Sequence, residues 1–222
     1  MGTDNLFHKR KALRLGRSEP KRAPYDKVLI VCEGSKTEPN YFRELIDHYE
    51  INTANVQVDG SCGSDPMSVA NHAIQLYREE RDKGDPYDRV YCVIDRDAHP
   101  GFGEALKKLE AQKPPKVFYA TVSIPCFEYW LLLHFDYTRA AFTSTGRVSM
   151  GDAALVALKT CLPKYEKGLV GTFSSLIGQL AFAKANAKRG LEDARKTAAD
   201  NPSTNVHELV EYLQNIKGKK PE

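Results

Sequence analysis

The fold of this chain is decided by residues 27–46, whose sequence is KVLIVCEGSKTEPNYFRELI. Residues 28–32 are an unbroken apolar run rich in β-branched side chains, which is typical of a strand buried on both faces of a parallel sheet. An acid, Glu33, ends the run, and a glycine follows it. Thr37 is then placed to cap a helix, and Pro39 fits the first turn of that helix. The stretch therefore predicts a strand, an acidic turn and a helix.

A second apolar run, residues 89–94, also ends in acids, Asp95 and Asp97. Residues two apart on an extended chain share a side, so both aspartates can face one point. Because the carboxyl ends of neighbouring parallel strands meet at one edge of a sheet, we expect Glu33 to lie beside them. A buried carboxylate is unfavourable unless a cation pairs with it. Since Mg²⁺ (or Mn²⁺) prefers oxygen ligands, these three acids are the predicted metal ligands and the predicted catalytic acids.

Further strands are expected at residues 56–58 and 117–122, which brings the sheet to about four strands. Residues 201–204 predict a turn. Besides the helix that begins near Thr37, helices are expected at residues 66–83, 104–112, 127–135, 152–161, 173–199 with a break at Gly190, and 206–217. The alternation of strands and helices in the first half predicts an α/β fold with a parallel sheet flanked by helices.

The expected organisation has three parts, a basic flexible arm, an α/β core and a C-terminal helical extension packed on the core, at residues 1–24, 25–124 and 125–222. The whole chain has a net charge of +3, whereas the arm has seven basic and two acidic residues, so the remainder has a net charge of −2. Such an arm can lie along a phosphate backbone, or it can be a solvated leader that aids solubility. The arm residues predicted to bind nucleic acid are Lys9, Arg10, Lys11, Arg14 and Arg17.

The composition excludes several classes of protein. A hydrophobic content of 41% and a charged content of 27% are ordinary for a soluble protein, and there is no apolar run of the roughly eighteen residues that a membrane span needs. The five cysteines are widely spaced, so neither a zinc site nor a disulfide framework is predicted. A P-loop is excluded as well, because the glycine expected upstream of Gly34-Ser-Lys-Thr is replaced by Leu29. We therefore expect a cytoplasmic protein that is not associated with a membrane.

Several stretches of the chain resemble the RloB-like family, whose members carry a Toprim domain. They are LIVCEGSKTEPNYF at 29–42, VIDRD at 93–97, SIPCFEYWLLLHF at 123–135, KYEK at 164–167 and NPSTNV at 201–206. The resemblance covers the chain from about residue 27 to its end. It implies a Toprim-like sheet in which Glu33, Asp95 and Asp97 bind Mg²⁺ for phosphodiester chemistry, and it implies a setting in bacterial antiviral defence.

Two further acids are candidate metal ligands. Glu38 stands five residues after Glu33, where related Toprim nucleases place a second acid. It is either a ligand of a second ion or a carboxylate that favours the dipole at a helix N-terminus. Glu128 lies in a strongly apolar helix, where its charge needs a metal or an arginine as partner, and we favour the metal. His134 follows on the same helix, where it either faces the same site or is a hydrogen-bonded core histidine, and we favour the core histidine.

Basic residues near the motifs are candidates for contact with the substrate. Lys164 and Lys167 follow a proline in a loop, where either can neutralise a phosphate in the transition state or simply be solvated. Lys164 is the predicted catalytic lysine, and Lys167 and Lys36 are predicted to bind nucleic acid.

These residues predict a Mg²⁺-dependent nuclease that acts on DNA or RNA, tRNA included. In this mechanism the aspartates hold the ion, Glu33 binds it or acts as a base on water, and a lysine stabilises the pentavalent phosphate. Two alternatives stay open: a non-catalytic regulatory module that binds metal and nucleic acid or a nucleotide, and a nucleotidyl transferase of the primase type. The expected partners are nucleic acid and a companion ATPase or sensor protein. A homodimer is an alternative that the sequence leaves open.

Overall fold

The structure is a computed structural model that describes residues 24–96 and 100–218. One predicted site residue, Asp97, lies outside the described residues. So do the five basic residues of the arm that are predicted to bind nucleic acid, Lys9, Arg10, Lys11, Arg14 and Arg17.

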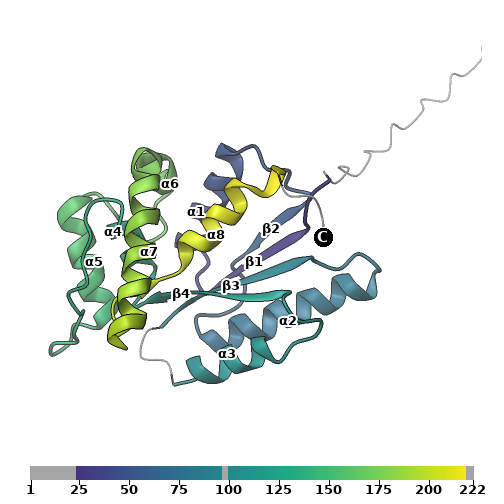
Figure 1. The fold of residues 1–222 in the computed structure, drawn as a ribbon, viewed down its shortest axis with the longest axis horizontal. Coiled ribbons are helices and arrows are strands. Elements are labelled where there is room, and N and C mark those ends of the chain that lie inside the picture. The colour runs from purple at the N-terminus through teal and green to yellow at the C-terminus, as the bar shows by residue number, and fades with distance from the viewer. Residues whose placement is uncertain (1–23, 97–99, 219–222) are drawn as a thin grey trace, which may run out of the picture.

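A five-stranded, mostly parallel sheet forms the centre of the described fold (Figure 1). The strands are β1 (Val28–Cys32), β2 (Val56–Asp59), β3 (Arg89–Asp95), β4 (Phe118–Ile124) and β5 (Ser203–Thr204). Their order in the sheet is β2-β1-β3-β4-β5; the first four are parallel, and β5 is antiparallel to β4. The predicted α/β sheet of four parallel strands is thereby confirmed. The fifth strand replaces the turn expected at residues 201–204.

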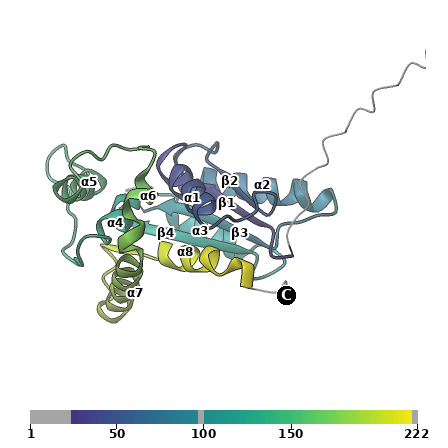
Figure 2. The same cartoon turned by 90° about the horizontal axis from the view of Figure 1, so that it is seen from above.

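Helices flank both faces of the sheet. They are α1 (Thr37–His48), α2 (Pro66–Asp82), α3 (Phe102–Glu110), α4 (Phe127–Leu132), α5 (Met150–Cys161), α6 (Thr172–Leu176), α7 (Leu180–Thr197) and α8 (Val206–Gln214), with 3₁₀-helices η1 (Ile177–Gln179) and η2 (Ile216–Gly218). α1 and α8 cover one face, and α2 and α3 cover the other (Figures 1 and 2). α4 to α7 gather beyond the carboxyl end of β4. Within the described residues, no helix is both long enough and apolar enough to cross a bilayer.

The two faces of β1 explain why its sequence is apolar throughout. Val28 and Ile30 pack into the core beneath α1 and α8, while Leu29 and Val31 pack into the core beneath α2 and α3. All of these side chains are completely buried. Complete burial of an aliphatic side chain of this size contributes roughly 1.5–3 kcal/mol, so β1 anchors both layers at once.

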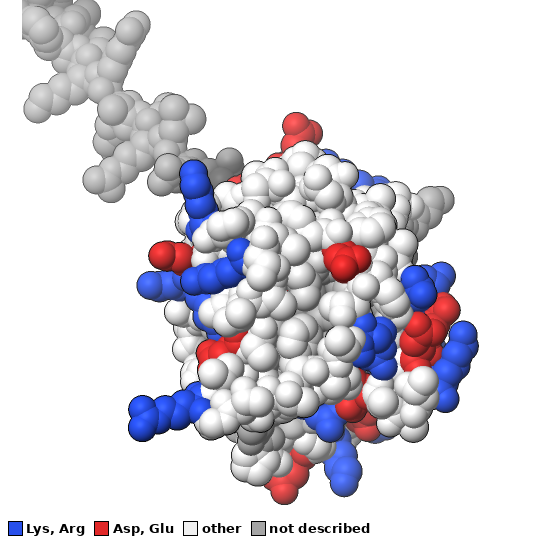
Figure 3. Space-filling view, turned by 90° about the vertical axis from the view of Figure 1, so that its left-hand side faces the viewer, with Lys and Arg blue, Asp and Glu red and all other residues white. Residues whose placement is uncertain are grey.

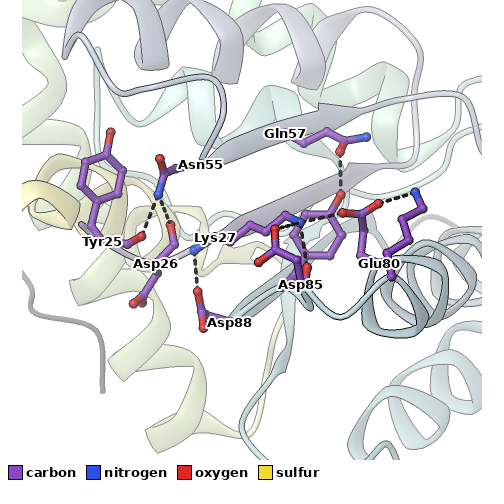
Figure 4. Close-up of polar contacts among 10 residues, drawn as sticks. Tyr25, Asp26, Lys27, Asn55, Gln57, Glu80, Asp85 and Asp88 are labelled. Atoms are coloured by element: carbon purple, nitrogen blue, oxygen red, sulfur yellow. Dashed lines mark hydrogen bonds and ion pairs between the residues drawn. The ribbon is translucent and has the colours of Figure 1, made fainter. Parts of the chain in front are cut away.

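A network of charges fixes the amino end of the sheet (Figure 4). The Lys27 ammonium lies 2.6 Å from a Glu80 carboxylate oxygen and 2.8 Å from one of Asp85. The backbone N–H of the same lysine donates to the Asp88 carboxylate at 2.6 Å. Because Lys27 is only 8% exposed, these contacts supply the partners that a buried ammonium requires. They tie the start of β1 to the end of α2.

The helix break expected at Gly190 is wrong. The helical run of residues 172–197 is interrupted by η1, and α7 passes through Gly190 without a break. Gly190 is buried, and a Cβ atom at this position would lie 3.5 Å from the Tyr129 hydroxyl oxygen and 3.7 Å from Cδ of Arg139. A Cβ atom at Gly190 would thus make only ordinary van der Waals contacts with α4 and the segment after it, and α7 does not need a glycine here. The helix expected at residues 127–135 is also shorter than predicted, because α4 ends at Leu132.

Candidate functional site

The acids that end β1 and β3 meet at the carboxyl edge of the sheet. β1 and β3 are neighbours, and the Glu33 N–H donates to the Val93 carbonyl oxygen at 3.1 Å. The Glu33 carboxylate in turn accepts a hydrogen bond from the Asp95 N–H, at 2.9 Å. The structure therefore brings together two of the three acids that the sequence places at this edge. The third, Asp97, is outside the described residues.

A cavity of about 260 Å³ opens at this point. Four carboxylates line it, from the ends of two strands and the first turns of two helices: Glu33, Glu38, Asp95 and Glu128. Two lysines, Lys36 and Lys167, also line it. The cavity thus collects all four acids that the sequence nominates within the described residues.

Glu38 is buried in an unfavourable position for a negative charge. It lies in the first turn of α1 and is only 6% exposed. Its pKa is raised to about 7, first by burial and then by the negative charges of Glu128 and Glu33, against the opposing effects of a backbone hydrogen bond and Lys167. A carboxylate that only favoured the helix dipole would have a lowered pKa, so the dipole alone does not account for Glu38.

Asp95 is also in an unfavourable position for a negative charge. Its pKa is raised well above the usual range, first by burial and then by the charges of Glu38, Glu128 and Glu33. Its Oδ1 atom is buried and has no hydrogen-bond partner among the described residues. Buried acceptors normally have a donor, and this oxygen has none among the described residues. A cation would be a suitable partner for it.

The residues of the cavity fit a divalent cation in charge and in donor chemistry. Carboxylate oxygens are the ligands that Mg²⁺ and Mn²⁺ prefer, and a cation would remove the repulsion that raises the pKa values of Glu38 and Asp95. In residues 24–96 and 100–218, however, no three His, Cys, Asp or Glu side chains are grouped closely enough to hold an ion.

Glu128 has a lysine and a tyrosine as its neighbours. It is 2% exposed, and it accepts a hydrogen bond from the Tyr165 hydroxyl at 3.2 Å. The Lys167 ammonium lies 3.8 Å from the same carboxylate. Burial alone would lower the pKa of Lys167, but the charge of Glu128 and the other carboxylates raises it above the usual value. The ammonium is thus kept charged at the cavity.

Other predicted residues lie away from the cavity. Lys164 is exposed and does not line it, so Lys167 is the lysine of this loop that reaches the carboxylates. His134 is buried, with Nδ1 3.1 and 3.2 Å from the carbonyl oxygens of Trp130 and Leu131. Burial lowers its pKa to about 4. It is the core histidine that the sequence predicts.

The sequence missed two contributions to the site. Tyr165 is almost completely buried, and its hydroxyl donates a hydrogen bond to Glu128. The only feature of the sequence that points to this residue is its place between the two lysines of the loop. Thr37, expected to cap α1, does not do so: Lys36 occupies the cap position without a side-chain hydrogen bond, and the Thr37 hydroxyl accepts from the Gly168 N–H instead.

A larger cavity, of about 460 Å³, lies between α8 and the strands β3 and β4. Its principal cation, Arg89, lies over the rings of Tyr119 and Tyr212 and is paired with Asp26, with Nε 3.2 Å from the carboxylate. The charge at its centre is therefore balanced. We therefore take the cavity at the carboxyl edge, with its unbalanced buried charge, as the candidate site in preference to the larger cavity.

The side of the molecule that carries α5 has few charges across its middle (Figure 3). Lys, Arg, Asp and Glu side chains stand mainly at its margins. A polyanion gains little by lying across such a face, because phosphate contacts depend on Lys and Arg.

Comparison with known proteins identifies the family. The sequence profile of the family described as RloB-like protein matches residues 28–213, which include every strand and helix bearing a cavity residue. No curated protein and no solved structure matched the chain. Because the match extends over most of the sequence, the chain belongs to the RloB-like family.

Proposed function

We propose that this protein is a Mg²⁺-dependent nuclease of the Toprim type, which hydrolyses phosphodiester bonds of DNA or RNA. The observation that carries the proposal is the cavity at the carboxyl edge. There, buried carboxylates repel one another, and Asp95 presents an oxygen without a partner among the described residues. Perturbed acids in a cleft beside a charged lysine are a recurring feature of catalytic sites.

Asp95, Glu33 and Glu38 are the described residues that would hold the ion, and Asp97 is proposed to join them. When bound, Mg²⁺ would supply Lewis-acid activation and charge neutralisation at a phosphate. The Asp95 N–H fixes the Glu33 carboxylate by a 2.9 Å hydrogen bond, which orients Glu33 as ligand or as base on water.

Lys167 takes the role that the sequence predicts for Lys164. Its ammonium lines the cavity, and the carboxylates around it keep it charged. A charged group fixed beside a reacting phosphate stabilises the negative charge that develops in the transition state. Lys36, exposed at the rim, is placed to contact the nucleic-acid backbone.

The test is a cleavage assay with the purified full chain. Labelled tRNA, single-stranded DNA and duplex DNA are each incubated with Mg²⁺, Mn²⁺ or EDTA. We expect cleavage of at least one substrate that requires the metal, and a loss of at least about 100-fold in Asp95→Asn, since the catalytic ion would lose a central ligand. Glu110→Gln, which removes an exposed acid at the end of α3, is the matched control and retains full activity.

Two other results would indicate a different function, and a third would contradict the proposed site. Metal-dependent binding of nucleic acid without cleavage indicates a regulatory module, and the companion ATPase or sensor protein that we propose as a partner would then be the place to look for cleavage. Extension of a primer from added nucleotides indicates a transferase. Cleavage that persists in Asp95→Asn and in EDTA contradicts the proposed site.

A further inference from the structure

The loop that carries Lys167 is held by the first turns of α1. This loop, residues 163–171, connects α5 to α6 and is called the lysine loop below. Both backbone polar groups of Gly168 bind α1: its N–H donates to the Thr37 hydroxyl oxygen at 2.9 Å, and its carbonyl oxygen accepts from the Asn40 side-chain amide at 3.0 Å. The residue directly after Lys167 is therefore fixed at two points.

This attachment requires a glycine at position 168. Gly168 has a φ angle of +82°, a left-handed conformation that glycine adopts far more readily than other residues. A Cβ atom there would also lie 2.8 Å from Cβ of Lys36, closer than such atoms approach. The backbone of the loop at Gly168 thus packs directly against the Lys36 side chain at the N-terminus of α1, with no space between them.

A second attachment holds the far end of the lysine loop. The Glu44 carboxylate, one to two turns further along α1, accepts hydrogen bonds from the Gly171 N–H at 2.6 Å and the Ser174 N–H at 3.2 Å. Glu44 therefore anchors the end of the loop and the first turn of α6, leaving Lys167 next to the first attachment. The two attachments leave few free backbone torsions around Lys167.

The attachment has a direct consequence for the cavity. The Lys167 side chain is 60% exposed and has one contact within 4 Å among the described carboxylates, the 3.8 Å approach to Glu128. A lysine side chain loses rotamer entropy when it is held in one conformation, and a single long contact does not offset that loss. The position of the ammonium therefore depends on the backbone that carries it.

We propose that Thr37 and Asn40 are positioning residues, which hold the lysine loop on α1 so that the Lys167 ammonium stands at the carboxylate cavity and meets a phosphate of the substrate. The proposal rests on the proposed nuclease function for its phosphate, whereas the placement of Lys167 by Thr37 and Asn40 is independent of it. It assigns to the threonine and asparagine of the segment SKTEPN a task other than capping the helix.

The test compares Thr37→Val, which keeps the side-chain shape but loses the acceptor, with Thr37→Ser, which keeps the hydroxyl. Thr160→Val is the control, because the Thr160 hydroxyl bonds only within α5 and is exposed. We expect kcat/KM to fall about tenfold to 100-fold in Thr37→Val and in Asn40→Ala, since small displacements of a catalytic group have effects of this size. Thr37→Ser and Thr160→Val should stay close to the unaltered protein.

A double-mutant cycle separates positioning from a general loss of structure. If Thr37 acts through Lys167, Thr37→Val has no further effect in a Lys167→Ala background. Losses that multiply in the double mutant would overturn the proposal, even if each single variant were impaired.

A readout that needs no cleavage separates this proposal from the proposed function. Lysines are reductively methylated with ¹³C-formaldehyde, and the Lys167 signal is identified by its absence in Lys167→Arg. We expect this signal to move towards the position of freely solvated lysines in Thr37→Val and not in Thr37→Ser. An unchanged signal in Thr37→Val refutes the positioning role, whereas a failure of the unaltered protein to cleave any substrate refutes only the nuclease function.

Discussion

Glu38 and Asp95 differ from the other buried charged residues described above in how their charge is balanced. Lys27 is buried to a similar degree but has two carboxylates within 2.8 Å. Glu38 and Asp95 have other carboxylates as their main charged neighbours, and both have raised pKa values. Such an arrangement is unfavourable in the metal-free protein, and proteins retain it mainly where function requires it.

The raised pKa of Glu38 predicts how the stability of the metal-free protein depends on pH. In the folded state the pKa is about 7, against 4.5 in the unfolded state. Between these values the folded state binds more protons, so the free energy of unfolding falls as the pH rises through this window. Glu38→Gln removes the effect. In EDTA, we expect the variant to be more stable than the unaltered chain at pH 8, by up to about 3 kcal/mol, and the two to converge near pH 4.5.

Urea unfolding at several pH values measures this difference. Because Glu38 is surrounded by Glu33, Glu128 and Asp95, the transition belongs to the group rather than to one residue. Parallel curves for the two proteins across pH 4.5 to 8 would show that the carboxylates are already compensated in solution.

Removing the negative charge of Asp95 should abolish the stabilisation that a metal ion gives. A ligand that binds only the folded state adds about 2.7 kcal/mol at 100 times its Kd, which raises Tm by several degrees in a protein of this size. We expect Mn²⁺ or Mg²⁺ to raise the Tm of the unaltered chain and of Glu110→Gln, but not of Asp95→Asn. An equal rise in Asp95→Asn would place the ion elsewhere.

At the scale of single residues, the sequence predicts the positions of side chains that stand at the ends of strands. Glu33 and Asp95 were found because an acid that ends a buried strand must come to the carboxyl edge of a parallel sheet. The partner of Thr37 was not found, because Gly168 is 131 residues away in the chain and its backbone N–H leaves no trace in the sequence. Contacts of that kind depend on the packing of whole elements.

At the scale of elements, the sequence predicts strands and helices but not all of their boundaries. β1 and β3 can be predicted because continuous apolar runs of this length are typical of buried strands. The fifth strand has only two residues, and it exists because β4 offers Ser123 and Ile124 as antiparallel partners. Two residues are too few for a periodic pattern, so tertiary pairing rather than local preference decides their conformation.

The continuous path of α7 through Gly190 gives a prediction about helix stability. Glycine in a helix is less favourable than alanine by about 0.5–1 kcal/mol, and a methyl group at Gly190 would make ordinary van der Waals contacts, the nearest being 3.5 Å from the Tyr129 hydroxyl. We therefore expect Gly190→Ala to increase the free energy of unfolding by about 0.5–1 kcal/mol in denaturant titrations. A loss of stability would mean that α7 and α4 are packed more tightly than these distances indicate.

At the scale of the whole molecule, the two ends of the sheet differ in how the charges of buried side chains are balanced. At the amino end, Lys27 is surrounded by carboxylates from α2 and the segment after it (Figure 4). At the carboxyl end, four carboxylates converge on one cavity, with Lys167 as the charged lysine nearest to Glu128. The amino end therefore stabilises the fold, whereas the carboxyl end carries a less favourable arrangement of charge, which the proposed function explains as a site for a metal ion.

Because the two ends of the sheet are separate, we expect the loss of the Lys27 charge at the amino end to lower stability without changing metal binding at the carboxyl end. Lys27→Met leaves Glu80 and Asp85 without their buried cation, and we expect the free energy of unfolding to fall by about 2–3 kcal/mol. Lys83→Met is the matched control, because Lys83 also contacts Glu80, at 2.6 Å, but is 67% exposed, so its removal should lower the free energy of unfolding far less than the removal of Lys27. Calorimetric titration with Mn²⁺ at a temperature where all proteins are folded should give the same Kd for both variants and the unaltered chain. If the affinity of Lys27→Met fell along with its stability, the two ends of the sheet would be coupled, and the amino-end network would belong to the functional site.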